Sequence, residues 1–156
     1  MRVGTRTLIC PMSTERVDKN VVRITALLTA SVIAIALVLA VVAEEILLSI
    51  SLAVAVDYAV RVLTPLPHGP IGWTAARLAA RFNLTPAPMD KAPKIFAVRV
   101  GWIMALAVVG LFFVSPWAAA GVALTLMAFN LLDGLLDLCV GCYIYTYAVL
   151  PTFGEG

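Results

Sequence analysis

The stretch ITALLTASVIAIALVLAVVA, residues 24–43, contains no charged side chain and decides the class of this protein. As an α-helix, its 20 residues extend about 30 Å at roughly 1.5 Å per residue, which is the hydrocarbon thickness of a bilayer. Glu44 and Glu45 follow it, and a second apolar run, ILLSISLAVAVDYAVRVL, continues from 46 to 63. We interpret the two runs as consecutive membrane spans with the glutamates at the turn between them.

Two further apolar runs lie in the second half of the chain, at 95–114 and 117–138. Ser115-Pro116 separates them, because proline resists helix continuation and biases the preceding residue away from helical angles. The sequence therefore predicts an all-α membrane protein with four transmembrane helices in two hairpins.

The composition agrees with this fold class. The chain has 156 residues, of which 62% are hydrophobic and 13% are charged, and its mean hydropathy is +1.02. An ordinary soluble domain has about 25% charged residues, so the polar residues here are too few to cover a soluble globule. Together with a net charge of only +2, this excludes a cytosolic enzyme domain, a disordered tail and a nucleic-acid binder. The lipid bilayer is the expected surrounding.

The basic residues predict the orientation. All eleven Lys and Arg residues fall within 2–23 and 61–99. Loops rich in Lys and Arg stay in the cytoplasm, so we expect both termini and the central connection on the cytoplasmic side of a bacterial inner membrane. The glutamates at 44–45 then lie on the outer side.

The remaining segments are shorter. We expect residues 1–19 to be a flexible basic arm, with Met12 as an alternative start, and 151–156 to be a tail. Between them, 20–150 forms a single membrane domain. Its central connection includes a short helix over about 70–83, because Pro70 suits a first helical position and apolar residues then recur at helical spacing. This helix is expected to lie in the membrane interface between spans two and three.

Two acidic residues, Asp57 and Asp133, fall well inside the predicted spans, where an unpaired charge costs several kcal/mol, whereas Asp137 falls near the inner interface. Asp57 precedes Arg61 by one turn, which allows either a self-paired bridge or a proton or anion site. Asp133 lies at a depth similar to that of Arg99 and is expected to pair with it between helices. Such a group forms either a polar seam that holds helices together or a transport path.

The sharpest feature is Cys139-Val140-Gly141-Cys142, where span four reaches the cytoplasm. A purely structural disulfide is a poor explanation on a reducing side of the membrane. A redox or sulfur-handling pair, half of a metal site, and two packing residues remain as alternatives. The expected position of Cys139 near the carboxyl end of a long helix would raise its thiol pKa. Activation would therefore need nearby cations.

A tetrahedral zinc site would need Cys10 and His68 in addition to Cys139 and Cys142. His68 lacks the usual paired spacing of zinc ligands, so we expect no metal and no cofactor.

Four motifs follow one another along the chain: Asp57-x-x-x-Arg61, Gly69-Pro70, Lys94-x-Phe96-Ala97-x-x-x-Gly101 and Cys139-x-Gly141-Cys142-x-x-Tyr145. In combination they resemble an uncharacterised family of small bacterial four-helix integral membrane proteins, a domain of unknown function. The resemblance covers roughly residues 17–150. The resemblance implies the four-helix fold and favours a functional role for the two cysteines and Tyr145, but it implies no established activity.

The leading hypothesis is a membrane-embedded dithiol protein in which Cys139 and Cys142 perform thiol–disulfide exchange or sulfane-sulfur relay. A thioredoxin-like or sulfur-transferase protein is the expected partner, docked on the basic surface of residues 64–94. The alternative is a homodimeric transporter, or transport subunit, for a small anion or sulfur species. Its path would use Asp57, Arg61, Arg99 and Asp133. A non-catalytic membrane scaffold is the third hypothesis.

Overall fold

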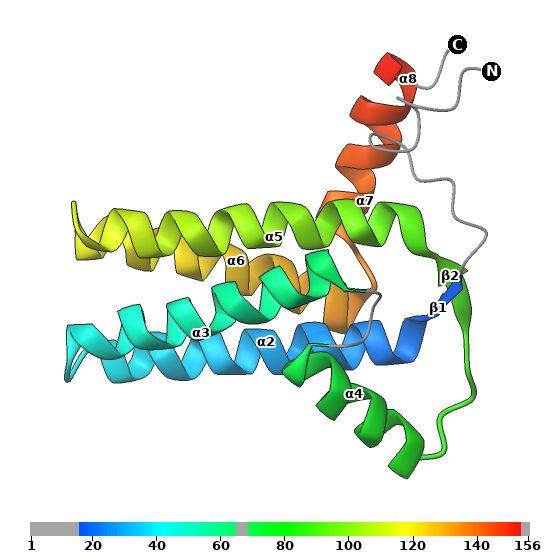
Figure 1. Ribbon diagram of the computed structural model, residues 1–156, viewed down its shortest axis with the longest axis horizontal. Coiled ribbons are helices and arrows are strands. Elements are labelled where there is room, and N and C mark those ends of the chain that lie inside the picture. The colour runs from blue at the N-terminus through cyan, green and yellow to red at the C-terminus, as the bar shows by residue number, and fades with distance from the viewer. Residues whose placement is uncertain (1–15, 65–68, 154–156) are drawn as a thin grey trace.

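The computed structural model describes residues 16–64 and 69–153. Within them, four long helices form one bundle: α2 (Lys19–Ala40), α3 (Glu44–Leu63), α5 (Lys91–Phe112) and α6 (Pro116–Leu136) (Figure 1). Each is long and apolar enough to cross a bilayer. This confirms the predicted class of a membrane protein with four transmembrane helices. Cys10, Met12 and His68 lie outside the described residues.

The four helices run side by side, with the α2–α3 and α5–α6 turns at the same end of the bundle (Figure 1). Helices α2 and α5 each pack against both α3 and α6. The opposite end is called the basic end here: α2 and α5 begin there, and α3 and α6 finish there. All of the shorter elements are located at this end (Figure 1).

Two of the long helices begin earlier than the uncharged runs predict. The Asp18 carboxylate accepts a hydrogen bond from the Asn20 N–H at 3.0 Å, so α2 begins at Lys19 rather than at 24. Helix α5 begins at Lys91 rather than at 95. Pro93 therefore lies in the first turn of α5, where its missing N–H costs no intrahelical bond. The earlier start brings Lys94 into the helix.

The interior of the bundle is rich in alanine. Five buried alanines from the four long helices belong to its hydrophobic core: Ala36, Ala55, Ala105, Ala119 and Ala123. Small side chains let helix backbones approach closely, which is how transmembrane helices gain packing energy. Large apolar side chains such as Leu52, Ile103 and Leu124 are exposed on the outside of the bundle, as expected of a surface in contact with lipid.

Helix α4 (Pro70–Arg81) leaves the basic end at an angle to the bundle (Figure 1). Its buried residues, Gly72, Ala75 and Ala79, lie along one stripe, and the helix packs against α2. On the exposed side, the Arg77 guanidinium stacks on the Trp73 ring at 3.9 Å from its centroid. An exposed tryptophan beside an arginine is typical of a helix at a membrane interface.

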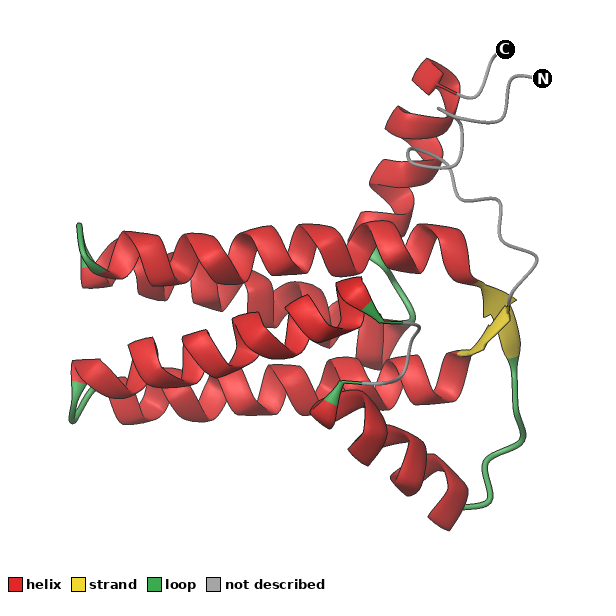
Figure 2. Ribbon diagram, viewed as in Figure 1, coloured by secondary structure: helices red, strands yellow, loops and turns green. Residues whose placement is uncertain are grey.

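Two features of the basic end were not expected from the sequence: a pair of short strands and a helical segment after α6. Strands β1 (Arg16–Asp18) and β2 (Pro88–Asp90) pair in antiparallel fashion and join the start of α2 to the start of α5 (Figure 2). Each strand has three residues, too few for a period-two pattern to be recognised in the sequence. After α6, the chain continues through α7 (Val140–Ile144), the π-helix η1 (Tyr145–Val149) and α8 (Leu150–Phe153). Residues 151–153, which were expected in the tail, are therefore helical.

Helix α5 approaches α3 closely at Gly101. A Cβ atom there would lie 2.7 Å from Tyr58 Cε1, whereas a Cβ at Gly110 would meet nothing within 4 Å. We expect Gly101→Ala to lower the free energy of unfolding by about 1–3 kcal/mol through overpacking. Gly110→Ala should leave it unchanged or raise it by up to about 1 kcal/mol. Unfolding in mixed detergent micelles, followed by circular dichroism, measures the free energy of unfolding of both variants. Equal losses in the two variants would contradict the packing argument.

Candidate functional site

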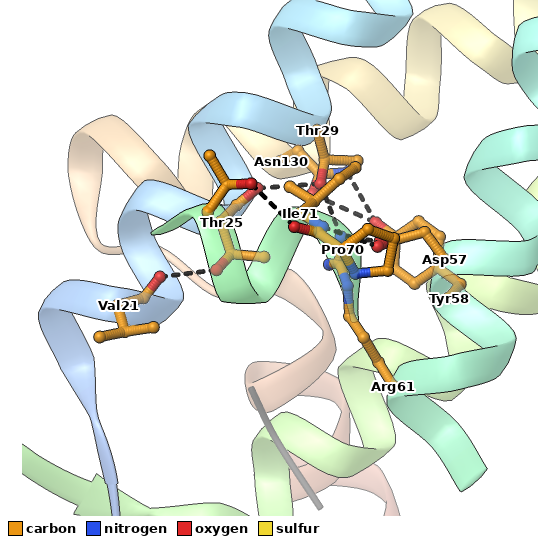
Figure 3. Close-up of polar contacts among 10 residues, drawn as sticks. Val21, Thr25, Thr29, Asp57, Tyr58, Arg61, Pro70, Ile71 and Asn130 are labelled. Carbon is orange, nitrogen blue, oxygen red and sulfur yellow. Dashed lines mark hydrogen bonds and ion pairs between the residues drawn. The ribbon is translucent and has the colours of Figure 1, made fainter. Parts of the chain in front are cut away.

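A buried ion pair ties three helices together near the basic end. Asp57 and Arg61 pair one turn apart on α3, and their side chains are only 3% and 4% exposed. Asp57 Oδ1 also accepts the backbone N–H of Ile71 at 3.1 Å, while Arg61 Nη2 donates to Thr29 Oγ1 at 3.1 Å (Figure 3). We call Thr29, Asp57, Arg61 and the Ile71 N–H the buried clamp. The Asp57–Arg61 bridge considered from the sequence is thus present, and the clamp joins α3 to α2 and to α4.

Gly69 lets the chain pass directly over the clamp. A Cβ atom at this position would lie 2.9 Å from Asp57 Oδ1 and 3.1 Å from Arg61 Cγ. Any larger residue would push the start of α4 away from the carboxylate. Gly69 followed by Pro70 therefore fits α4 against the ion pair and begins the helix at once.

Tyr58 connects the clamp to α6. The Arg61 guanidinium lies 4.9 Å from the Tyr58 ring centroid, and the Tyr58 hydroxyl lies 3.2 Å from Asn130 Oδ1 and 3.1 Å from Nδ2 (Figure 3). Because the ring also contacts α5 at Gly101, Tyr58 links three of the four spans.

Asp133 has a different partner from the one expected. Its carboxylate accepts a hydrogen bond from Lys94 Nζ at 2.5 Å, and Lys94 is only 4% exposed. The predicted Arg99–Asp133 pair is therefore wrong. Arg99 follows Lys94 by five residues, which places it about 140° further around α5 at 3.6 residues per turn, and it is exposed on the outside of the bundle.

The two cysteines follow a break in the chain. Helix α6 ends at Leu136, Asp137 adopts left-handed backbone angles with φ 59°, and Cys139 is the N-cap of α7. The Cys139 Sγ accepts the backbone N–H of Cys142 at 3.3 Å. The expectation that Cys139 lies on the carboxyl end of the span-four helix is therefore wrong. It lies instead at the amino end of a new helical segment, where backbone N–H groups favour a thiolate.

The pKa values of the two thiols move in opposite directions. The hydrogen bond from the Cys142 thiol, aided by the positive charge of Lys94, lowers the pKa of Cys139 to about 7 although burial opposes this. The same hydrogen bond and burial raise the pKa of Cys142. Both are free thiols. The pair thus comprises one thiolate near neutral pH and one thiol that donates to it.

Close contacts with α5 hold the cysteine segment in place. A Cβ atom at Gly141 would lie 2.7 Å from the Ala97 Cβ, so glycine is needed for this approach. The Tyr145 ring packs against Phe96 with 5.6 Å between centroids, and Tyr145 is 7% exposed. Tyr145 is therefore an anchor for the segment, outside the cavity described next.

A half-enclosed cavity of about 110 Å³ lies between the buried clamp and the cysteines. Its walls come from α2, α3, α4, α5, α6 and α7, and most of its lining is apolar. Its polar lining residues are Thr25, Tyr58, Arg61, Lys94, Asn130, Asp133 and Cys139.

The structure brings together most of the residues singled out from the sequence. Arg61, Asp133 and Cys139 line the cavity, with Asp57 bound to Arg61 and Cys142 beside Cys139. The pairing role of Lys94 was missed. A signal for it exists, because Lys94 lies seven residues before Gly101, and buried residues of α5 recur along that face.

No group of three or more His, Cys, Asp or Glu residues suited to a metal occurs in residues 16–64 and 69–153. The zinc alternative also depends on Cys10 and His68, which lie outside these ranges.

The buried clamp predicts a non-additive effect on stability. Asp57→Leu leaves Arg61 buried without its counter-ion, and we expect it to lower the free energy of unfolding by about 3–5 kcal/mol. The double variant Asp57→Leu with Arg61→Leu removes both charges and should recover part of this loss. A double-mutant cycle in detergent micelles measures the difference. Additive losses would contradict a coupled pair.

No curated protein and no solved structure matches the chain. The sequence profile of a domain of unknown function (DUF4395) matches residues 17–149, nearly the whole of the described bundle and its cysteine segment. The match confirms the resemblance to an uncharacterised family that rested on four motifs. This chain belongs to the DUF4395 family.

Proposed function

We propose that this protein is a membrane-embedded dithiol protein that performs thiol–disulfide exchange or sulfane-sulfur relay through Cys139 and Cys142. The observation that carries the proposal is the restart of the chain as a helix at Cys139. Its Sγ receives a backbone N–H and the thiol of Cys142 as donors, close to the cationic Lys94. A role in packing alone would not explain why the two thiols have different pKa values or why a cavity lies beside Cys139.

We place this chemistry at the cytoplasmic face of a bacterial inner membrane. The basic end carries the described Lys and Arg residues, including Arg77 and Arg81 on α4, whereas Glu44 and Glu45 begin α3 at the opposite end. Segments rich in Lys and Arg remain in the cytoplasm. The exposed arginines of α4 also supply a basic surface for an acidic partner of the thioredoxin-like or sulfur-transferase kind.

In thiol–disulfide exchange, the Cys139 thiolate attacks one sulfur of a substrate disulfide. A mixed disulfide forms, and the other half leaves as a thiolate, which takes the proton of Cys142. Cys142 then attacks the Cys139 Sγ, so the internal disulfide forms and the second substrate thiolate leaves. The substrate gains two electrons and the cysteine pair loses two. A dithiol partner restores the pair by the reverse exchange.

The transport hypothesis has less support. Arg99 faces outward, away from the cavity, and the charges of Asp57 and Arg61 are used in the buried clamp. We therefore propose thiol chemistry rather than transport, and a scaffold role remains the outcome if the cysteines prove unreactive.

The thiol pKa of Cys139 predicts a pH profile. In a Cys10→Ser background, the alkylation rate of Cys139 should rise with pH through a midpoint near 7, because the thiolate is the nucleophile. Cys142→Ala removes the donating thiol and should move the midpoint upward, toward the value of about 8.5 for an ordinary cysteine. Iodoacetamide labelling in lipid nanodiscs, read by mass spectrometry of the cysteine peptide, measures both rates.

Cys139→Ser is the matched control. It removes the hydrogen bond and the charge of Cys139, and burial alone should keep the labelling midpoint of Cys142 at or above the value of about 8.5 for an ordinary cysteine. A midpoint of about 8.5 or higher for Cys139 in the unmodified pair would overturn the proposal.

A further inference from the structure

The two cysteines differ in what surrounds them. Cys139 lines the 110 Å³ cavity, whereas Cys142 is absent from its lining. We propose that this cavity is the binding site for a small hydropersulfide, R–S–S–H with R of one or two carbons, and that its outer sulfur passes to Cys139 and then to Cys142. This inference rests on the proposed dithiol function. Of the two reactions proposed for it, the inference favours sulfane-sulfur relay rather than exchange with protein disulfides.

The volume of the cavity sets the size of the ligand. Engineered apolar cavities of about 150 Å³ hold one benzene molecule, whereas pockets for drug-sized ligands measure about 300–1,000 Å³. A cavity of 110 Å³ therefore admits a molecule of a few heavy atoms. A loop of a partner protein does not fit inside it.

The lining sets the charge of the ligand. Val98, Met104 and Phe129 contribute apolar walls, which suit a polarisable sulfur chain. The two cationic residues in the lining are already paired, Lys94 with Asp133 and Arg61 with Asp57. A doubly charged sulfur oxyanion would lose its hydration without gaining an unpaired cation. A hydropersulfide bound in its protonated, neutral form avoids that cost, and this is the form whose outer sulfur a thiolate attacks. Asn130 offers it a polar contact.

The transfer balances without an external oxidant. The Cys139 thiolate attacks the outer sulfur, a bond forms between Cys139 Sγ and that sulfur, and the substrate S–S bond breaks. R–S⁻ leaves and takes a proton from water, while Cys139 carries the –S–SH group. Cys142, as a thiolate, then attacks the same outer sulfur, and Cys139 leaves as a thiolate. The proton released by Cys142 goes to water, so there is no net oxidation.

The opposite shifts of the two thiols favour this direction of transfer. A thiol of low pKa is the better leaving group, and a thiol of high pKa is the stronger nucleophile once deprotonated. When Cys139 leaves as a thiolate, the hydrogen bond from Cys142 and the charge of Lys94 stabilise it, so Cys139 is the better leaving group. While Cys139 carries the extra sulfur it is not a thiolate, so it no longer holds the proton on Cys142, and the buried Cys142 can ionise and attack. Sulfur therefore moves away from the cavity toward Cys142.

The test uses the full chain in nanodiscs, in a Cys10→Ser and Cys142→Ala background that stops the sulfur on Cys139. Methyl hydropersulfide and the larger glutathione hydropersulfide are supplied separately, and addition of one sulfur atom to Cys139 is followed by mass spectrometry. We expect methyl hydropersulfide to load Cys139 at least about tenfold faster, as for a pocket with a size limit. With Cys142 restored, the added sulfur should appear on Cys142.

Variants that fill the cavity test its contribution independently of the reactivity of the Cys139 thiol. Ala26→Leu and, in a separate variant, Val98→Phe enlarge a side chain that lines the cavity. Each should lower the rate at which methyl hydropersulfide loads Cys139 by at least about tenfold. Ala34→Leu, on α2 but outside the lining, is the matched control and should leave the rate unchanged. Size-exclusion chromatography and, with Cys142 present, the alkylation midpoint near 7 check that each variant keeps its fold and its thiolate.

Equal loading by the two hydropersulfides, or unchanged rates in both correctly folded filling variants, would overturn the inference. If Cys139 keeps its midpoint near 7 but reacts only with a protein disulfide, the cavity inference is wrong while the dithiol function stands. If the midpoint itself is that of an ordinary cysteine, the proposed function is wrong.

Discussion

The Asp57–Arg61 ion pair is the constraint on which the rest of this structure depends. Two charges inside a membrane span are costly unless each is paired and hydrogen-bonded. Further hydrogen bonds come from outside α3, from the Ile71 N–H of α4 and the Thr29 hydroxyl of α2. Satisfying the pair therefore requires α2, α3 and α4 to meet at one place. Gly69 is required for the same reason, because a side chain there would collide with the carboxylate.

From this pair, contacts extend to the cysteines. Arg61 faces the ring of Tyr58, and Tyr58 contacts Gly101 on α5 and Asn130 on α6. The second ion pair, Lys94 with Asp133, joins α5 to α6 closer to the cysteine segment. The cavity lies between two ion pairs whose charges cancel, so it contains polar atoms but little net charge. The other end of the bundle has an alanine-rich core instead, so the buried charged residues Asp57, Arg61 and Lys94 gather at one end.

The sequence predicted the spans well, since uncharged runs of about 20 residues have few alternatives to a membrane helix. It also identified Asp57 with Arg61, because an i,i+4 pair is local. Contacts between helices were harder to predict. Arg99 and Lys94 both lie near the start of α5, and only the direction in which the helix faces selects Lys94 for Asp133. The pairing of β1 with β2 joins segments far apart in the sequence and leaves no pattern in either.

The turn at Asp137, at the end of α6, decides which backbone groups surround the cysteines. Asp137 adopts left-handed angles, and the Leu138 N–H bonds back to the Leu132 carbonyl, which closes the helix. Had α6 continued, the cysteines would lie among carbonyl groups that disfavour a thiolate. Because the chain turns at Asp137 and restarts at Cys139, they lie beside N–H groups that favour one. Lys19, which pairs with Asp137, connects this turn to the start of α2. The proposed reactivity of the dithiol therefore depends on a turn outside the cysteine motif, which the spacing of the motif could not reveal.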